Sequence, residues 1–331
     1  MVFGLLSRSV RQGPNLKFLS FEMSTQYDLV VAGEINPDLI LSGPELEPHF
    51  GQAEILAEDA ELTAGSSAVI FACGVARLGL RVAFVGVIGD DLFGHFMLDW
   101  LVEAGIDSKY VYIDPTLKTG LSVILNRGQD RAILTYPGAI GALRGEQISD
   151  ELLGQARHLH VTSYFMQTAL QPGLPDLFRR ARRLGLTTSL DTNWDPQESW
   201  AGVEELLPLT DVLLPNAGEA LAISGKNDVG EACAQLSLQV PTLVIKLGAR
   251  GALARQAEYS ARCPALSVEV VDTVGAGDSF DAGFLYGYLG GWSLEDCTKI
   301  GVACGSLSTR ARGGTQGQPT LEEALQVLEA R

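Results

Sequence analysis

The segment Asp272–Phe280, DTVGAGDSF, holds the residue types best suited to chemistry in this chain. Its three small residues would leave backbone N–H groups bare at the start of a helix: Gly275, Ala276 and Gly277. Such a turn attracts anions, because the N–H groups point outward and the helix dipole favours negative charge there. Asp278 follows directly. We expect its carboxylate to take a proton from a hydroxyl group while the turn holds a phosphoryl group, although an acidic first turn is also common in helices.

Three other polar motifs follow stretches with the character of buried strands: Asp191–Pro196 (DTNWDP), Asn216–Glu219 (NAGE) and Lys246–Gly251 (KLGARG). Parallel strands end at one edge of a sheet, so these motifs are expected where ligands bind. An Asn and a Glu three residues apart at a helix start can hold hydrated Mg²⁺ near phosphates, or form a capping box. The glycines of the third motif either admit a ligand close to the backbone or belong to an ordinary β-turn.

Composition and missing motifs exclude several classes of function. The 331 residues are 46% hydrophobic and carry a formal net charge of -16, which disfavours binding to nucleic acid. There is no GxxxxGK[ST] loop, and no GxGxxG follows the first apolar strand. No apolar run reaches about 18 residues, so no membrane span is expected. The five cysteines form no CxxC pair, which predicts free thiols in a reducing compartment and thus a cytoplasmic protein.

Apolar strand-like runs alternate with helical patterns along most of the chain. This alternation predicts an α/β fold with a mostly parallel central sheet covered by helices on both faces. A β-like run at 266–271 is expected before the anion turn. Two looser β regions, about 34–62 and 110–136, interrupt the alternation and are expected to form a small β-sheet lid, the second through a hairpin.

The N-terminal segment 1–24 differs from the rest, which we take as one domain, 25–331. It is basic and has no acidic residue before Glu22. This composition weakly resembles a targeting segment. The alternative is a start codon assigned too early, with Met23 as the natural first residue.

The order and spacing of these motifs resemble the ribokinase, or PfkB, family of carbohydrate kinases. Asp272–Phe284 is similar to the family's C-terminal signature, and Ala64–Gly94 to its N-terminal signature. The resemblance extends from about Tyr27 to the C-terminus. It implies a ribokinase-like three-layer fold with a β lid that closes over the sugar. It also implies Mg²⁺-dependent transfer of the γ-phosphoryl group of ATP to a hydroxyl group of a small sugar.

The resemblance assigns roles on the nucleotide side. Asp278 would be the base, with the anion hole at residues 275–277. Asn216 and Glu219 match the motif that positions Mg²⁺ and phosphate through water. The nucleotide-binding turn would comprise Lys246, Gly248, Ala249 and Gly251. Lys246 occupies a position where ribokinases often have Thr, so it would either contact phosphate directly or form a structural salt bridge.

The resemblance also assigns residues to the acceptor. Asp38 matches the acidic residue that contacts sugar hydroxyls, and Gly65 and Ser66 match the glycine pair that approaches the sugar. The chain departs from the pattern at Ala64, which replaces a glycine, and at Val69, near the place of an asparagine. An altered polar contact there should change which hydroxyls are read. A last candidate lies in the lid: Arg131 would meet a carboxylate or phosphate of the substrate, or is a solvated hairpin residue.

Cation binding and assembly follow from the same resemblance. A monovalent cation such as K⁺ would lie between two loops, with ligands from Asp272, Val274, Ser308 and Gly313. A homodimer is expected through the lid, near 36–62 and 110–136, because pairing hides open strand edges.

Two other functions stay open. A nucleoside kinase of the same family would stack its base on aromatic residues of the lid regions, which here are Phe50, Tyr110, Tyr112 and Tyr136. A non-catalytic sensor of sugar or nucleotide would not need Asp278 or the anion hole, and the intact turn argues against it.

Overall fold

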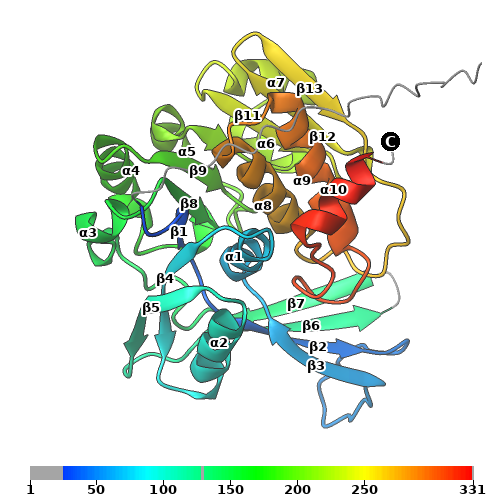
Figure 1. Ribbon diagram of the computed structural model, residues 1–331. Helices are drawn as coiled ribbons and strands as arrows, with labels where there is room; N and C mark the ends of the chain where they lie inside the picture. Colours follow the sequence, from blue (N-terminus) through cyan, green and yellow to red (C-terminus); the bar gives the residue numbers. More distant parts are fainter. Residues whose placement is uncertain (1–24, 128–129, 330–331) are drawn as a thin grey trace, which may run out of the picture.

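The computed structural model describes residues 25–127 and 130–329, so the predicted extension 1–24 lies outside the described residues. A nine-stranded sheet forms the centre, in the order β13-β12-β11-β10-β9-β8-β1-β4-β5 (Figure 1). Its strands are β1 (Leu29–Ala32), β4 (Val82–Gly89), β5 (Asp107–Asp114), β8 (His158–Thr162), β9 (Thr187–Asp191), β10 (Val212–Leu213), β11 (Thr242–Lys246), β12 (Ala252–Gln256) and β13 (Tyr259–Cys263). All neighbours from β11 to β5 run parallel, and β12 and β13 are antiparallel. The predicted mostly parallel sheet is therefore confirmed.

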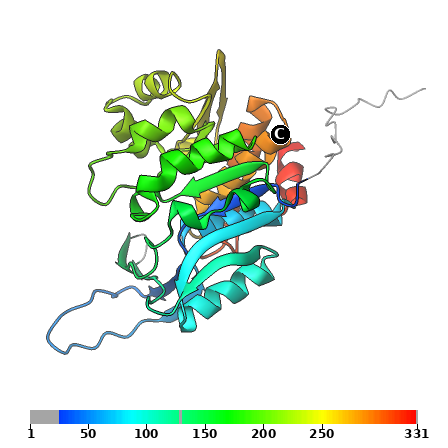
Figure 2. The ribbon, with the colours of Figure 1, turned by 90° about the vertical axis from the view of Figure 1, so that its left-hand side faces the viewer.

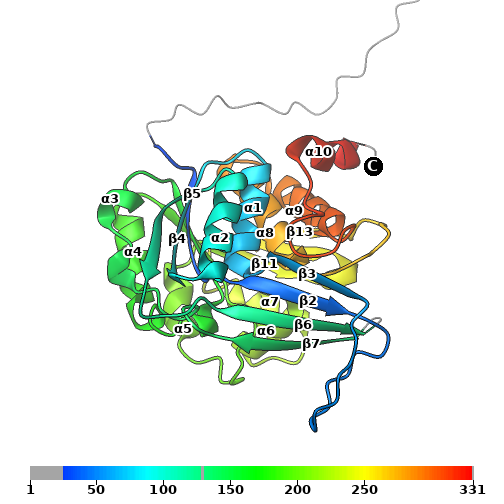
Figure 3. The same cartoon turned by 90° about the horizontal axis from the view of Figure 1, so that it is seen from below.

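Helices cover both faces of this sheet (Figures 1 and 3). One layer contains α1 (Ser67–Arg77), α2 (Leu92–Glu103), α8 (Ala276–Leu289), α9 (Leu294–Ser308) and α10 (Leu321–Glu329). The other contains α3 (Asp150–Leu153), α4 (Leu174–Arg183), α5 (Val203–Leu206), α6 (Ala217–Ser224) and α7 (Val229–Leu236). Each helix layer packs on one face of the sheet and forms a hydrophobic core with it. Alternate residues of β1 belong to these two cores: Leu29 and Val31 to the first, Val30 and Ala32 to the second. A strand buried on both faces explains its continuous apolar sequence.

A separate four-stranded sheet, in the order β3-β2-β6-β7, lies at the carboxyl-end side of the large sheet. It consists of β2 (Pro37–Ser42), β3 (Asp59–Ala64), β6 (Leu121–Arg127) and β7 (Asp130–Tyr136). Strands β6 and β7 pair antiparallel, so the predicted hairpin is confirmed. The second lid segment, predicted at 110–136, begins too early, because β5 pairs with β4 in the large sheet. Residues 43–58 form a long connection that extends away from the body (Figures 2 and 3).

The prediction of a β-like run at 266–271 is wrong. This segment has no strand partner and crosses the end of α9 as an irregular chain. Its backbone is bonded to the helix instead: the Leu266 N–H donates to Ser306 Oγ at 3.1 Å, and the Val271 N–H donates to the Thr309 carbonyl at 2.8 Å. Alternating apolar residues here line a cavity, which produces the strand-like pattern without a strand.

All five cysteines are buried and none of them forms a disulfide, as predicted. None of the helices in the described part of the chain has the length and apolar character needed to cross a membrane.

Candidate active site

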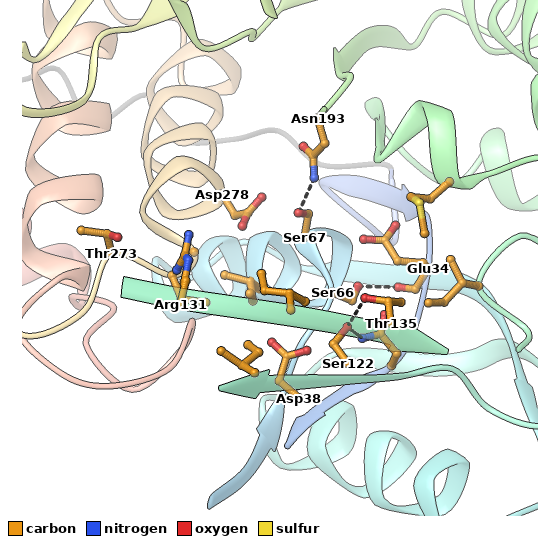
Figure 4. Close-up of a pocket in the computed structure, with 18 residues that line it drawn as sticks. Glu34, Asp38, Ser66, Ser67, Ser122, Arg131, Thr135, Asn193, Thr273 and Asp278 are labelled. Carbon is orange, nitrogen blue, oxygen red and sulfur yellow. Dashed lines mark hydrogen bonds between the residues drawn. The ribbon is translucent and has the colours of Figure 1, made fainter. Parts of the chain in front are cut away.

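A polar cavity of about 370 Å³ lies between the small sheet and the carboxyl ends of the large sheet (Figure 4). The small sheet closes one side with alternate residues of its strands, because successive side chains point to opposite faces. On that face Asp38 pairs with Ser122, and Ser122 with Thr135. The starts of α1 and α8 close the opposite side, with Ser66, Ser67 and Asp278.

Asp278 lies in the first turn of α8 and faces the polar cavity (Figure 4). The residue is 9% exposed. Burial is the largest cause that raises the pKa of this carboxyl, to about 8; the negative charges of Asp191 and Glu34 add to the effect, while Lys246 opposes it. A carboxyl group with a pKa near neutrality suits a base that must both accept and release a proton.

The two glycines of the anion turn differ in what an added side chain would contact. Gly275 caps α8 with φ +69, and a Cβ there would lie 2.8 Å from Cα of Gly314 and from Cγ2 of Ile70. Only glycine fits this position. At Gly277 the nearest atom to an added Cβ would be Lys246 Nζ, at 3.6 Å, which is an ordinary contact. The space beside Gly277 is therefore open, in front of bare helical N–H groups and next to an ammonium group.

Asp38 lies on β2, beside the start of α1, and lines the polar cavity. It packs so tightly that a Cβ on Gly65 would lie 2.1 Å from Asp38 Oδ1. Burial raises the pKa of Asp38 to about 7, and the charge of Glu34 raises it further, while a hydrogen bond from Ser122 lowers it. Ser66 has φ 70 and ψ 126, a region that is costly for any residue other than glycine. Its hydroxyl donates to the Glu34 carbonyl at 2.6 Å.

Glu34 is a site residue that the sequence analysis missed. It is 5% exposed, lines the polar cavity and accepts three hydrogen bonds: from Ser163 Oγ at 2.9 Å, Gln167 Nε2 at 3.1 Å and the Ala68 N–H at 3.3 Å. Its position directly after Gly33, at the end of β1, was the available signal. Other polar residues that the sequence analysis did not assign also line the cavity: Asn36, Ser67, Ser122, Thr135, Asn193 and Thr273.

Arg131 lines the same cavity from β7. In Figure 4 it lies on the small-sheet side, between Thr273 and Asp278. Within the described part of the chain, its guanidinium forms no ion pair. The same cavity is lined by the carboxyl groups of Glu34, Asp38 and Asp278. A cation without an ion pair at its wall is available for a negatively charged group of a ligand.

A second, more apolar cavity of about 510 Å³ lies on the other side of the anion turn. The predicted nucleotide-binding residues meet here: Lys246, Gly248, Ala249 and Gly251. Gly251 has φ +87, and a Cβ would lie 1.9 Å from the Cys263 carbonyl oxygen. Ala276 and Gly277 line this apolar cavity, Gly275 and Asp278 line the polar one, and Thr273 lines both. The two cavities therefore meet at the anion turn.

Lys246 forms the salt bridge that the sequence analysis left as an alternative. Its Nζ lies 2.7 Å from Asp191 Oδ2 and 2.8 Å from Asp281 Oδ2. Burial opposes the charged form, but Asp191, Asp281 and Glu219 outweigh it and raise the pKa of Lys246. The ammonium still borders the apolar cavity, so the ion pairs leave one side of it accessible.

Asn216 and Glu219 form the capping box that was the other interpretation of their motif. Asn216 Oδ1 accepts from the Glu219 N–H at 3.0 Å, and Glu219 Oε2 accepts from the Asn216 N–H at 2.8 Å. Burial raises the pKa of Glu219 to about 7, and Asp191 raises it further, while Lys246 lowers it. Four buried carboxyl groups thus surround one ammonium, an arrangement that an added cation would stabilise.

The two segments expected to hold a monovalent cation lie side by side. Asp272 Oδ1 accepts from the Val274 N–H at 3.0 Å, and Asp272 Oδ2 accepts from the Gly313 N–H at 3.0 Å. Ser308 Oγ donates to the Gly305 carbonyl at 3.0 Å. Among the described residues, no three His, Cys, Asp or Glu side chains converge as a metal site. A cation here would therefore depend on backbone carbonyl groups and Asp272.

Comparison with known proteins agrees with this geometry. Residues 26–321 match the model of the pfkB family carbohydrate kinases. The chain is 31% identical to 2-dehydro-3-deoxygluconokinase of Bacillus subtilis, over 78% of this chain and 85% of that one. It is also 31% identical to fructokinase of Klebsiella pneumoniae, over 77% and 88%. Among solved structures, an E. coli protein described as a ribokinase II, in complex with ATP and Mg²⁺, superposes with a TM-score of 0.82 at 23% identity, covering 92% of this chain and 100% of that one.

Proposed function

Because the chain belongs to the pfkB family of carbohydrate kinases, we propose that it transfers the γ-phosphoryl group of ATP to a hydroxyl group of a small carbohydrate. The observation that carries this proposal is the meeting of two cavities at one turn. The polar cavity holds Asp278, and the apolar cavity borders Lys246 and Gly277. Phosphoryl transfer needs positioning and charge stabilisation more than covalent chemistry, and a turn of bare N–H groups between two sites supplies both.

Asp278 is the proposed base. It would accept the proton of the acceptor hydroxyl as the oxygen attacks phosphorus, while the N–H groups of residues 275–277 stabilise the charge on the transferring group. The apolar cavity would take the adenine and ribose of the nucleotide, with Gly248, Ala249 and Gly251 in close approach and Lys246 near the phosphates. Bound Mg²⁺ would neutralise phosphate charge, held through water by Asn216 and Glu219. Burial raises the pKa of Glu219, and the charge of Asp191 adds to the effect, so a cation close by would favour its ionised form.

The acceptor proposed for the polar cavity is a monosaccharide or a sugar acid. Asp38 and Glu34 offer carboxylate oxygens to sugar hydroxyls, and Gly65 and Ser66 let the ring approach the start of α1. Arg131 would bind a carboxylate or phosphate substituent. The apolar part of the lining is aliphatic, with Ile70, Ile124, Val274, Ile133, Ile140 and Met166.

The aromatic residues on which the nucleoside alternative depended do not lie in this cavity. Tyr110 and Tyr112 belong to β5 of the large sheet, Phe50 is fully exposed on the 43–58 connection, and Tyr136 is on the outer face of β7. A stacked base therefore has no aromatic partner among the described residues of the cavity. The sugar proposal is favoured for this reason.

We also propose a homodimer through the small sheet. On the face opposite the cavity, one register row is apolar across all four strands: Leu62, Leu39, Val123 and Leu134. Leu134 is 60% exposed, and the outer edges of β3 and β7 have no strand partner among the described residues. Covering this row with a second copy would remove it from water. Light scattering at micromolar concentration should give twice the chain mass, and a single-chain mass would contradict the proposal.

The kinase proposal is tested by ADP release from Mg·ATP across a panel of acceptors, each with and without K⁺. The panel contains ribose, fructose, 2-keto-3-deoxygluconate, fructose phosphates, inositol, adenosine and inosine. One acceptor should be turned over, and Asp278→Asn should lower kcat about 10²- to 10⁴-fold without loss of nucleotide binding, because the amide cannot accept a proton. Normal turnover by Asp278→Asn would refute the base role. Absence of ADP release with every acceptor of the panel would count against the kinase proposal. Stimulation by K⁺ would support the cation site between Asp272 and Gly313.

A further inference from the structure

A continuous series of buried and half-buried polar side chains connects the two cavities. At the apolar cavity it begins with Lys246, whose ammonium lies 2.7 Å from the carboxylate of Asp191. Asp191 is the last residue of β9 and is 2% exposed. Asp281 holds the same ammonium from α8, at 2.8 Å. Asp191 is therefore a buried charge with a partner on the nucleotide side.

On its other side, Asp191 faces the amide group of Asn193. The amide nitrogen is assigned toward this carboxylate, at 3.2 and 3.3 Å from its oxygens, because a carboxylate only accepts hydrogen bonds. The amide oxygen then accepts from Ser67 Oγ at 2.5 Å and from Ser163 Oγ at 3.0 Å. Asn193 and Ser67 line the polar cavity, close to Asp278 (Figure 4). Ser163 has one hydroxyl proton, which it donates either to this amide oxygen or to Glu34 Oε1, 2.9 Å away.

The acceptor end of the series is held in costly conformations. Asn193 and Ser163 both have φ 52, in the left-handed region. Such residues persist where surrounding bonds determine them, and they concentrate at functional sites. The bonds that determine Asn193 here are those to Asp191, Ser67 and Ser163.

We propose that Asp191 is a positioning residue that couples the nucleotide cavity to the acceptor cavity, by holding Lys246 with one side of its carboxylate and Asn193 with the other. This inference rests on the proposed kinase function. A phosphate group beside Lys246 would share its ammonium with Asp191 and so weaken the ion pair between Lys246 and Asp191. The Asp191 carboxylate would then accept a stronger hydrogen bond from Asn193. Nucleotide binding would then order Asn193 and Ser67 before the acceptor arrives. Because coupling is reciprocal, the acceptor would equally favour the nucleotide-bound arrangement.

Hydrogen–deuterium exchange of the full chain, with and without Mg²⁺ and a non-hydrolysable ATP analogue, tests this proposal without turnover. The perturbing variant is Asp191→Asn, which keeps the shape and leaves Lys246 paired with Asp281. A second variant is Asn193→Gly, because glycine adopts the positive φ without strain and removes only the amide. The matched control is Asp211→Asn, which changes a carboxyl that accepts from Thr188 at the opposite end of the strands. Calorimetry on each variant measures nucleotide binding independently.

In the wild type and in Asp211→Asn, the nucleotide should slow exchange about 5-fold or more in segments 66–70 and 191–195. Asp191→Asn and Asn193→Gly should bind the nucleotide but lose this slowing. If Asp191→Asn does not fold, the exchange measured for Asn193→Gly tests the inference by itself. Slowing that persists in both variants, or that is absent from a nucleotide-bound wild type, would overturn the inference and leave the kinase proposal intact. If the wild type binds no nucleotide, both this inference and the kinase proposal are wrong, so the two failures can be told apart.

Discussion

Substituting alanine for Gly277 should leave the protein folded and remove most of its activity. An added Cβ would meet no atom closer than Lys246 Nζ at 3.6 Å, so no clash arises. Gly277 is helical, and exchanging glycine for alanine within a helix stabilises by about 0.5–1 kcal/mol. The new methyl group would, however, fill the space between Lys246 and the bare N–H groups of α8. Loss of one such donor from an anion hole costs about 10²–10³ in kcat.

Gly275→Ala supplies the contrast, since the same methyl group has different neighbours there. The residue would have to adopt φ +69, at a cost of about 1–2 kcal/mol. Its Cβ would also lie 2.8 Å from Gly314 and Ile70, and such overpacking costs about 1–3 kcal/mol. We expect unfolding free energy to fall by about 2–5 kcal/mol, as the sum of these two effects.

The pair is compared by urea denaturation and by ADP release with the acceptor identified from the panel. Gly277→Ala should match or exceed wild-type stability with kcat lowered at least 100-fold, whereas Gly275→Ala should be less stable. Full activity in a folded Gly277→Ala would refute the anion hole. Equal loss of stability in the two variants would refute the reasoning from the Cβ contacts.

Three further outcomes are expected. Because Asp278 must be ionised to act as a base and burial raises its pKa to about 8, kcat/KM should rise with pH up to about 8 and then level off; a residual rate that follows the same curve in Asp278→Asn would contradict this. Arg131→Gln should lower kcat/KM about 10- to 100-fold for an anionic acceptor and little for a neutral one, since one charge-assisted bond is lost; equal effects on both would exclude a charge contact. Burial lowers the pKa of His158 to about 3, below its unfolded value of about 6.5, so folding favours the neutral ring: stability is complete above about pH 6.5 and decreases as the pH falls, by about 2 kcal/mol at pH 5. Urea titrations of the wild type and of His158→Gln at pH 7.5 and 5 test this: His158→Gln should remove this contribution of about 2 kcal/mol and leave those of the other buried titratable groups, such as His160, in place.

The sequence by itself determined the features that depend on neighbours along the chain. The strand–helix alternation predicted the mostly parallel sheet, because each element buries its own apolar residues. The helix start at residues 275–277 and the capping box of Asn216 and Glu219 were also predictable, since their contacts span only one helical turn. The β6–β7 hairpin was predicted because its two strands follow each other directly along the chain.

Tertiary structure alone decided what depends on distant partners. Lys246 meets Asp191 and Asp281, 55 and 35 residues away in the sequence, and spacing does not show such pairs. Glu34 meets Ser163 across 129 residues, which is why it was missed. The edge strand β5 and the segment 266–271 were misassigned, because an alternating apolar pattern fits a lid strand, a sheet edge and a cavity wall equally well. Which neighbour covers the apolar side is decided only when the sheets and helices pack together.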